Sequence, residues 1–290
     1  MTSIAAEGRR TRPNALSRAW AFVLRHVLTV YSLLFFLYLM LPIAVVIVFS
    51  FNHPAGRFNY TWRGFTWDNW LNWNAVPGIQ SAITLSLEIA LFASIVATAL
   101  GTLIALALVR YGFRGRGTTN LIIFLPLSTP EIVLGASLAT LFLHSASYGL
   151  SIPFGFWTIL IAHIMFCISF AVVTVKARLI GFDRHLEEAA MDLGANEWTT
   201  FVKVTLPLIA PAILAALLLC FAISVDDFVV TYFNAGNQVT FPIFVWGAAR
   251  VATPPQINVI GTAIFAVAVT GMLANIFFQN IRAKKGAVTA

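Results

Sequence analysis

Long apolar runs constrain this chain more than any other feature of its sequence. Each run is long enough to cross about 30 Å of hydrocarbon as a helix, which needs about 20 residues. Six such runs occur: Val27–Phe51, Ile83–Val109, Asn120–Leu143, Phe156–Val175, Leu208–Val230 and Ile257–Ile281. Because backbone polar groups cannot be left unpaired in lipid, the runs predict an all-α membrane protein with six transmembrane helices.

The composition agrees with this class and excludes others. Hydrophobic residues make up 59% of the chain and charged residues only 10%, against about a quarter charged in soluble domains. The runs do not alternate polar and apolar residues as the strands of an outer-membrane barrel do. Cys167 and Cys220 fall inside apolar runs, so we expect packing roles for them and no disulfide.

The distribution of basic residues predicts the orientation. All the Lys and Arg residues except Arg57, Arg63 and Arg250 fall in segments that share one side if the N-terminus is cytoplasmic. The positive-inside rule therefore places both termini in the cytoplasm and explains the net charge of +7 without nucleic acid.

The positions of the apolar runs and of the basic residues divide the chain into segments. We expect a basic, uncleaved cytoplasmic tail at 1–26, a first helix with an external loop at 27–78, a five-helix core at 79–281 and a cytoplasmic tail at 282–290. The external segment Asn237–Gln256 suggests either a partly inserted gating or docking element or an aromatic anchor at the interface.

One polar stretch, EEAAMDLGANEWTTFVKVTLPL at Glu187–Leu208, interrupts the apolar pattern on the cytoplasmic side. It predicts two short helices within a loop at 183–206, the first capped by Asp183 and ended by Gly194, the second capped by Asn196. Pro207 would then start the fifth span. Physical reasoning favours a dock for a soluble partner and an amphipathic loop on lipid headgroups equally.

The stretch resembles the EAA loop of bacterial ABC-importer permeases. The pattern E-A-A, three residues, G, nine residues, I-x-L-P is matched throughout except for Val204 in place of isoleucine. The resemblance implies a type I ABC-importer permease fold whose loop couples to a cytoplasmic ATPase. The residues implied in that coupling are Glu187, Glu188, Ala189, Ala190, Gly194, Leu206 and Pro207.

The chain has no G-x-x-x-x-G-K-[ST] phosphate-binding loop, so ATP would be bound by partner subunits. We also find no nucleophile–base constellation and no metal-ligand pattern, and we expect a transport subunit that is not an enzyme and carries no cofactor of its own.

Four acids lie within the spans, and no Lys or Arg lies well inside one. A carboxylate at the bilayer centre costs roughly 3 kcal/mol or more, so such residues are candidates for a substrate pathway. The acids are Glu88, Glu131, Asp226 and Asp227. Each has a structural alternative: Glu88 snorkels to the interface, Glu131 serves a helix start after Thr129 and Pro130, and the Asp pair lies at a solvated outer helix end. We expect His163 to be packed and hydrogen-bonded.

The segments AISVDDFVVTYF, TPEIV and KARLIGFDRHLEEAAMDLGA resemble the second permease subunit of spermidine/putrescine importers. This implies a path for small cations through Asp226, Asp227, Glu131 and Tyr232 in the bacterial inner membrane. It also implies a second permease subunit, two ATPase subunits and an external binding protein as partners. The alternatives are a permease for another small solute, a proton-coupled secondary transporter and a non-transporting assembly factor.

Overall fold

The structure is a computed structural model that describes the backbone of residues 15–145, 147, 149–150 and 152–288, and side chains between 25 and 271 within those ranges. Residues 1–14 of the predicted basic tail at 1–26 and the last two residues of the C-terminal tail lie outside the described residues.

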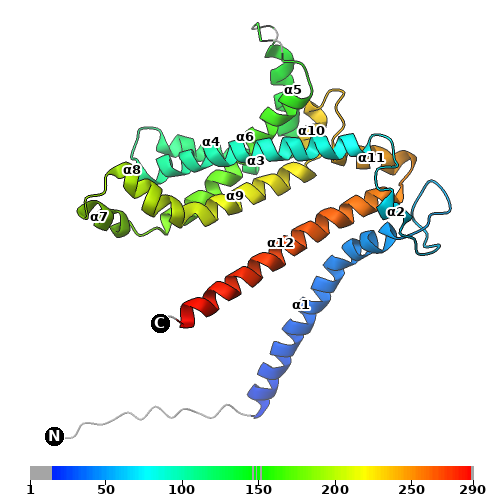
Figure 1. The fold of residues 1–290 in the computed structure, drawn as a ribbon, viewed down its shortest axis with the longest axis horizontal. Coiled ribbons are helices and arrows are strands. Elements are labelled where there is room, and N and C mark those ends of the chain that lie inside the picture. Colours follow the sequence, from blue (N-terminus) through cyan, green and yellow to red (C-terminus); the bar gives the residue numbers. More distant parts are fainter. Residues whose placement is uncertain (1–14, 146, 148, 151, 289–290) are drawn as a thin grey trace. The chain divides into compact units, whose positions relative to one another are not determined.

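Helices dominate the described part of the chain (Figure 1). They are α1 (Ala15–Ser50), α2 (Asp68–Leu71), α3 (Ile79–Arg110), α4 (Arg116–Ser128), α5 (Glu131–Ser145), α6 (Phe156–Ile180), α7 (His185–Asp192), α8 (Glu197–Thr200), α9 (Leu206–Asp226), α10 (Val229–Asn234), α11 (Phe241–Val251) and α12 (Pro255–Val288). A π-helical segment, Phe201–Thr205, joins α8 to α9.

Four helices within the described residues are long and apolar enough to cross a membrane: Arg25–Ser50, α3, α6 and the continuous helix Glu197–Asp226. The bent pair α4 and α5 makes a fifth if it is one span. In α12 the apolar part, Pro255–Gly271, is shorter. The all-helical membrane class is confirmed, while the count of six spans and the side of the termini stay predictions.

The predicted third span is broken, as its prolines indicated. Helix α4 ends at Ser128, α5 begins at Glu131, and the two axes differ by 109°. Pro130 precedes α5 and its carbonyl accepts hydrogen bonds from Val133 and Leu134, so the break comes where Pro cannot continue the preceding helix.

Residues 76–253 form one compact unit whose core is α3, α6 and α9. In Figure 1 these helices run alongside one another. Small residues line the buried face of α3 at helical spacing, which lets the helix axes approach closely. At Gly101 an added Cβ would lie 2.5 Å from Cβ of Ala171 on α6, so only glycine fits at this crossing.

Residues 1–75 and 254–290 form the other unit, in which α1 packs against α12. The external segment after α1 is held by buried amides: Asn52 donates to Oδ1 of Asn59 at 2.6 Å, and Asn69 donates to the carbonyls of Ser50 and Asn52. This network satisfies backbone groups that a loop would otherwise leave unpaired.

Several expected boundaries shift. Helix α1 begins at Ala15, inside the segment expected as a tail, and α12 continues to Val288. The fifth span ends at Asp226 instead of Val230, because Asp227 is extended (φ −64°, ψ 121°) and a separate helix α10 follows. The external segment contains α11, whose first amide, at Phe241, donates to Oγ of Ser86 on α3 at 2.8 Å.

Candidate functional site

The polar loop at 183–206, which the sequence predicts on the cytoplasmic side, starts with a side-chain hydrogen bond. Oδ1 of Asp183 accepts a hydrogen bond from the amide of His185 at 3.0 Å and lies 2.7 Å from its Nδ1. The hydrogen bond from His185 lowers the pKa of the Asp183 carboxyl, and in return raises the pKa of His185. Asp183 therefore accepts from the first amide of α7, but the N-cap position is Arg184, which makes no side-chain cap, so the expected cap lies one residue away from its predicted place.

Helix α7 ends in the left-handed turn expected at Gly194. Gly194 has φ +88°, its amide donates to the carbonyl of Met191, and the amide of Ala195 donates to that of Ala190. This pair of bonds is a Schellman motif, which satisfies the last carbonyls of the helix. A side chain at Gly194 would be strained by the positive φ.

The second helix begins at Asn196, whose Oδ1 accepts from the amide of Thr199 at 2.8 Å. The expected helix start at Pro207 needs correction, because the helix that begins at Glu197 runs without interruption to Asp226. The π-helical segment makes this possible, because the amide of Leu206 donates to the carbonyl of Phe201, five residues earlier. The helix therefore continues into Pro207 without a break.

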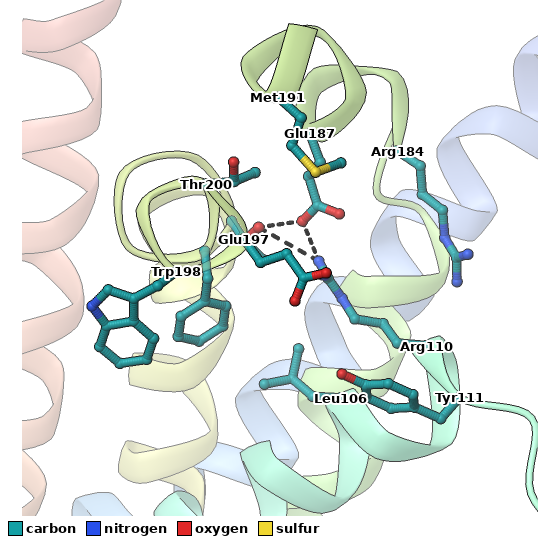
Figure 2. A pocket seen from close by; sticks show the side chains of 11 residues that line it. Leu106, Arg110, Tyr111, Arg184, Glu187, Met191, Glu197, Trp198 and Thr200 are labelled. Carbon is teal, nitrogen blue, oxygen red and sulfur yellow. Dashed lines mark hydrogen bonds and ion pairs between the residues drawn. The ribbon is translucent and has the colours of Figure 1, made fainter. Parts of the chain in front are cut away.

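Glu187 faces inward and ties three elements together. Its carboxylate accepts hydrogen bonds from the guanidinium of Arg110, at the end of α3, and from the hydroxyl of Thr205, before α9 (Figure 2). Arg184 adds a bond to the carbonyl of Val109 at 3.0 Å. The stretch is thus fastened to the C-terminal end of α3 and to the π-helical segment before α9. Sequence analysis missed Arg110 and Thr205, because nothing local marks contacts 77 and 18 residues away.

The opposite side of the stretch is exposed. Glu188, Ala189 and Gly194 are exposed, Ala190 is half-buried, and Leu193 is 90% exposed. At the end of the stretch Leu206 is half-buried and Pro207 exposed. An exposed leucine beside small residues and a carboxylate gives a surface that another protein can approach closely.

Behind α7 and α8 lies a cavity of about 530 Å³. Figure 2 shows the side chains around it. It is lined by Leu106, Arg110, Tyr111, Arg184, Glu187, Met191, Glu197, Trp198, Thr200, Phe201 and Thr205. Glu187 and Arg110 both line this cavity, and their contact joins α7 to the end of α3.

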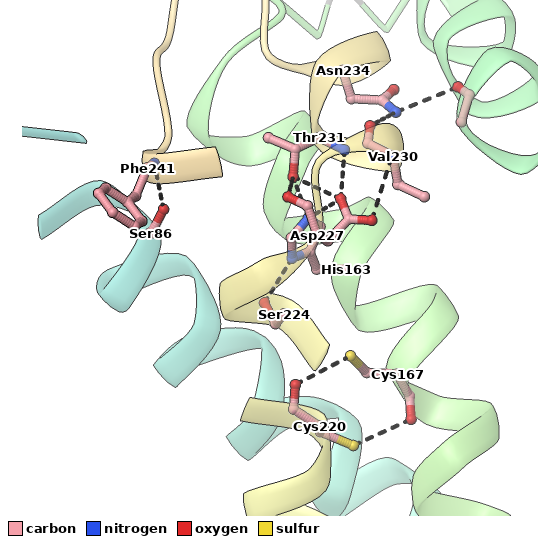
Figure 3. Close-up of polar contacts among 11 residues, drawn as sticks. Ser86, His163, Cys167, Cys220, Ser224, Asp227, Val230, Thr231, Asn234 and Phe241 are labelled. Carbon is pink, nitrogen blue, oxygen red and sulfur yellow. Dashed lines mark hydrogen bonds and ion pairs between the residues drawn. The ribbon is translucent and has the colours of Figure 1, made fainter. Parts of the chain in front are cut away.

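The other end of the continuous helix carries the acid pair. Asp227 is buried, and its Oδ2 accepts from the amide of Thr231 at 2.7 Å and from its hydroxyl at 2.8 Å, while Oδ1 lies 3.4 Å from the amide of Val230 (Figure 3). The carboxylate therefore caps α10 across the break that follows α9.

His163 joins both sides of that break from α6. Nδ1 lies 2.6 Å from Oγ of Ser224 on α9, and Nε2 lies 2.9 Å from Oγ1 of Thr231 on α10 and 3.4 Å from Oδ2 of Asp227. Because the Thr231 hydroxyl donates to Asp227, a neutral imidazole with its proton on Nε2 satisfies every member. His163 is packed and hydrogen-bonded as expected. The sequence shows no Lys or Arg within the spans to pair with the acids. In the structure the imidazole of His163 is the partner of Asp227.

The other predicted pathway residues belong to the same unit. Asp226 is the exposed last residue of α9, and Tyr232 on α10 is 50% exposed. Glu131 is exposed at the first position of α5, where Thr129 bonds back to Leu125 and does not cap. Helix α5 packs on α10 through Gly135, where an added Cβ would lie 3.0 Å from the ring of Phe233.

Known proteins resemble this chain in sequence and in fold. Residues 97–286 match the family "Binding-protein-dependent transport system inner membrane component". The chain is 39% identical to the "Spermidine/putrescine transport system permease protein PotC" of Escherichia coli (strain K12), over 82% of this chain and 88% of that protein. It is 37% identical to the "Putrescine transport system permease protein PotI" of the same organism, over 87% and 90% of the two chains. The fold resembles a bacterial ABC transporter involved in the import of alginate, with a TM-score of 0.60, 18% identity and coverage of 92% and 98%.

Proposed function

This chain belongs to the family of binding-protein-dependent transport system inner membrane components, and from that premise we propose that it is the polyamine-conducting permease subunit of an ATP-driven importer. The observation that carries the substrate class is the identity to spermidine/putrescine and putrescine permeases along most of both chains. ATP is bound by two cytoplasmic ATPase subunits, and this subunit holds no cofactor. A second permease subunit and an external binding protein complete the complex in the bacterial inner membrane.

The coupling stretch and the acid pair lie at the two ends of one helix. The 30 residues from Glu197 to Asp226 form a continuous helix, about 45 Å long at 1.5 Å per residue. We assign the ATPase contact to the exposed residues Glu188, Ala189 and Gly194. Because Glu187 fastens α7 to the base of this helix, a displacement of the exposed face moves the helix and its outer end together.

Substrate recognition is assigned to the outer end. Polyamines are cations at neutral pH, Asp226 presents an exposed carboxylate at the end of α9, and Tyr232 presents an exposed ring on α10. Asp227 is engaged by Thr231 and His163, so its role is to hold the break between α9 and α10. Glu131 at the start of α5 belongs to the same path. In alternating access, the pathway opens to one side of the membrane or to the other. ATP binding shifts the equilibrium between these two states only if it makes more favourable contacts in one of them.

The test is ATP-driven uptake of labelled spermidine and putrescine into proteoliposomes that contain the complete complex and its binding protein. Glu188→Ala is expected to lower uptake by about tenfold or more, as a broken coupling between two sites would. Asp226→Asn is expected to raise the half-saturation concentration by about tenfold, the effect of losing about 1.4 kcal/mol of charge attraction.

Asp68→Asn is the matched control, because Asp68 is an exposed carboxylate on α2 in the other unit. Normal uptake in Glu188→Ala would refute coupling through the exposed stretch and favour a proton-coupled transporter. A wild-type complex that hydrolyses ATP in response to a different binding protein and moves neither polyamine would refute the substrate assignment.

A further inference from the structure

Three basic residues gather where α4 begins and α6 ends. Nζ of Lys176 on α6 donates to Oδ1 of Asn120 on α4 at 2.6 Å. The side-chain amide of Asn120 also donates to the carbonyl of Arg116, the first residue of α4, at 3.0 Å. Nε of Arg178, two residues after Lys176, donates to the carbonyl of Leu208 on α9 at 3.4 Å. We call Arg116, Lys176 and Arg178 the basic band.

The elements that carry the basic band supply no carboxylate to neutralise it. Residues 89–130 and 132–182 contain no Asp or Glu, so neither α4 nor α6 carries an acid near the band. The carboxylate that follows α6, at Asp183, contacts His185 instead. Among the described residues, no recorded ion pair includes a member of the band. Three positive charges therefore lie together with only neutral acceptors.

An exposed apolar surface continues from the band along α4. Leu121, Ile122 and Leu125 are 67%, 62% and 62% exposed, whereas Ile123 is buried. In a helix that crosses or enters a membrane, such a surface is suited to contact with acyl chains. The positive-inside rule places the band at the cytoplasmic end of this surface. The arrangement matches the two parts of an anionic phospholipid, a negative headgroup and apolar chains.

We propose that the basic band binds the phosphate headgroup of an anionic phospholipid in the cytoplasmic leaflet, and that the acyl chains of this lipid lie on the exposed apolar surface of α4. Because α4, α6 and the start of α9 share the band, the bound lipid joins the ends of three helices. This inference does not depend on the substrate of the importer, so it stands or falls separately from the proposed function.

A role in membrane topology alone has a different consequence. Basic residues are enriched at cytoplasmic helix ends because they set orientation during insertion, without holding a particular lipid. If that is the whole role of the band, the folded complex does not distinguish anionic from zwitterionic lipids. A second permease subunit that covers this surface of α4 would also leave no selective lipid there.

The experiment measures lipid binding to the complete, delipidated complex by native mass spectrometry. Phosphatidylglycerol and phosphatidylcholine are titrated separately, and we expect the wild type to bind phosphatidylglycerol more tightly. Each basic residue near an anionic lipid contributes about a factor of five in affinity. The affinity for phosphatidylglycerol should therefore fall about fivefold in Lys176→Gln and about 25-fold in the double variant Arg116→Gln/Lys176→Gln.

The matched control is the double variant Arg57→Gln/Arg63→Gln, which removes two exposed positive charges from the external segment of the other unit. We expect it to bind phosphatidylglycerol as the wild type does. Lys176→Arg keeps the charge and should retain the affinity. Equal losses in the two double variants would overturn the assignment to the band. Equal affinity of the wild type for the two lipids would overturn the proposal even if the Arg116→Gln/Lys176→Gln variant does not assemble.

Thermal unfolding of the solubilised complex gives a second readout. A ligand that binds only the folded state stabilises it, so phosphatidylglycerol should raise the unfolding midpoint of the wild type and of the Arg57→Gln/Arg63→Gln control. It should raise the midpoint less in Arg116→Gln/Lys176→Gln. Inorganic phosphate at the same concentration should have no such effect, because it lacks acyl chains. An equal rise with phosphate would mean that the band binds free anions and would overturn the lipid assignment.

Discussion

At the scale of single residues, the two carboxylates of the acid pair have different surroundings and different roles. The Asp227 carboxylate accepts hydrogen bonds from the amide and hydroxyl of Thr231, and the same hydroxyl contacts His163. Asp226, its neighbour in the chain, is exposed. Adjacent residues on a helix point about 100° apart, but here the helix ends between them, so their surroundings differ more than periodicity alone implies.

The Thr231 hydroxyl is expected to be the weak link of this cluster. Thr231→Val keeps the size of the side chain but removes the nearer partner of His163 Nε2 and the hydroxyl that donates to Asp227, at a cost of about 1 kcal/mol. Thermal unfolding of the purified complex should show a lower midpoint for Thr231→Val. Thr231→Ser retains the hydroxyl and is the control; equal loss in both variants would contradict the role of the hydroxyl.

At the scale of elements, close helix crossings and one continuous helix organise the unit 76–253. The α3–α6 crossing is tight because small residues face one another, most closely at Gly101 and Ala171. The helix from Glu197 to Asp226 incorporates a π-helical segment just before Pro207. Sequence rules for proline predict a helix start there. The π-helical hydrogen bond instead joins α8 to α9, so the helix begins earlier, within the predicted loop.

Gly101→Ala is expected to disrupt the α3–α6 crossing. The new Cβ meets Ala171 Cβ at 2.5 Å and the backbone nitrogen of Val172 at 3.1 Å, an overpacking that costs about 1–3 kcal/mol. The yield of monodisperse complex on size-exclusion chromatography measures it. Gly112→Ala, which meets nothing within 4 Å, is the matched control. Ala171→Gly should partly restore the yield of Gly101→Ala, and absence of any rescue would argue against this contact.

At the scale of the whole molecule, the arrangement across the membrane is the main expectation still to be tested. The bias of Lys and Arg predicts both termini in the cytoplasm. Four helices, or five with the bent pair, satisfy length and hydropathy within the described residues, and six spans need α12 to cross as well.

Single cysteines can establish the topology in a background with Cys167→Ala and Cys220→Ala. We expect a membrane-impermeant maleimide to label Asn74→Cys and Asn237→Cys in intact spheroplasts, and Ser3→Cys and Thr289→Cys only after permeabilisation. Labelling of Thr289→Cys in intact spheroplasts with Ser3→Cys protected would mean an odd number of spans, and α12 would not cross.

The sequence by itself determined the features that depend on short-range order. Hydropathy identified the membrane helices, because burying about 20 residues in lipid depends on composition more than on neighbours. Local chemistry placed the Gly194 turn and the Asn196 cap, and it placed the cap of the first helix to within one residue, because each bond spans only a few residues. The spacing of the EAA pattern likewise pointed to the family.

Only the tertiary structure decided which side chains meet across the fold. It brought Glu187 to Arg110, His163 to Ser224 and Thr231, and Trp246 to Phe228 and Tyr232. It also decided that Glu187 faces inward while Glu188 is exposed, and that Asp227 caps a helix that sequence patterns had merged with α9. These contacts join residues far apart in the chain, so they depend on how helices cross and pack, which no local pattern encodes.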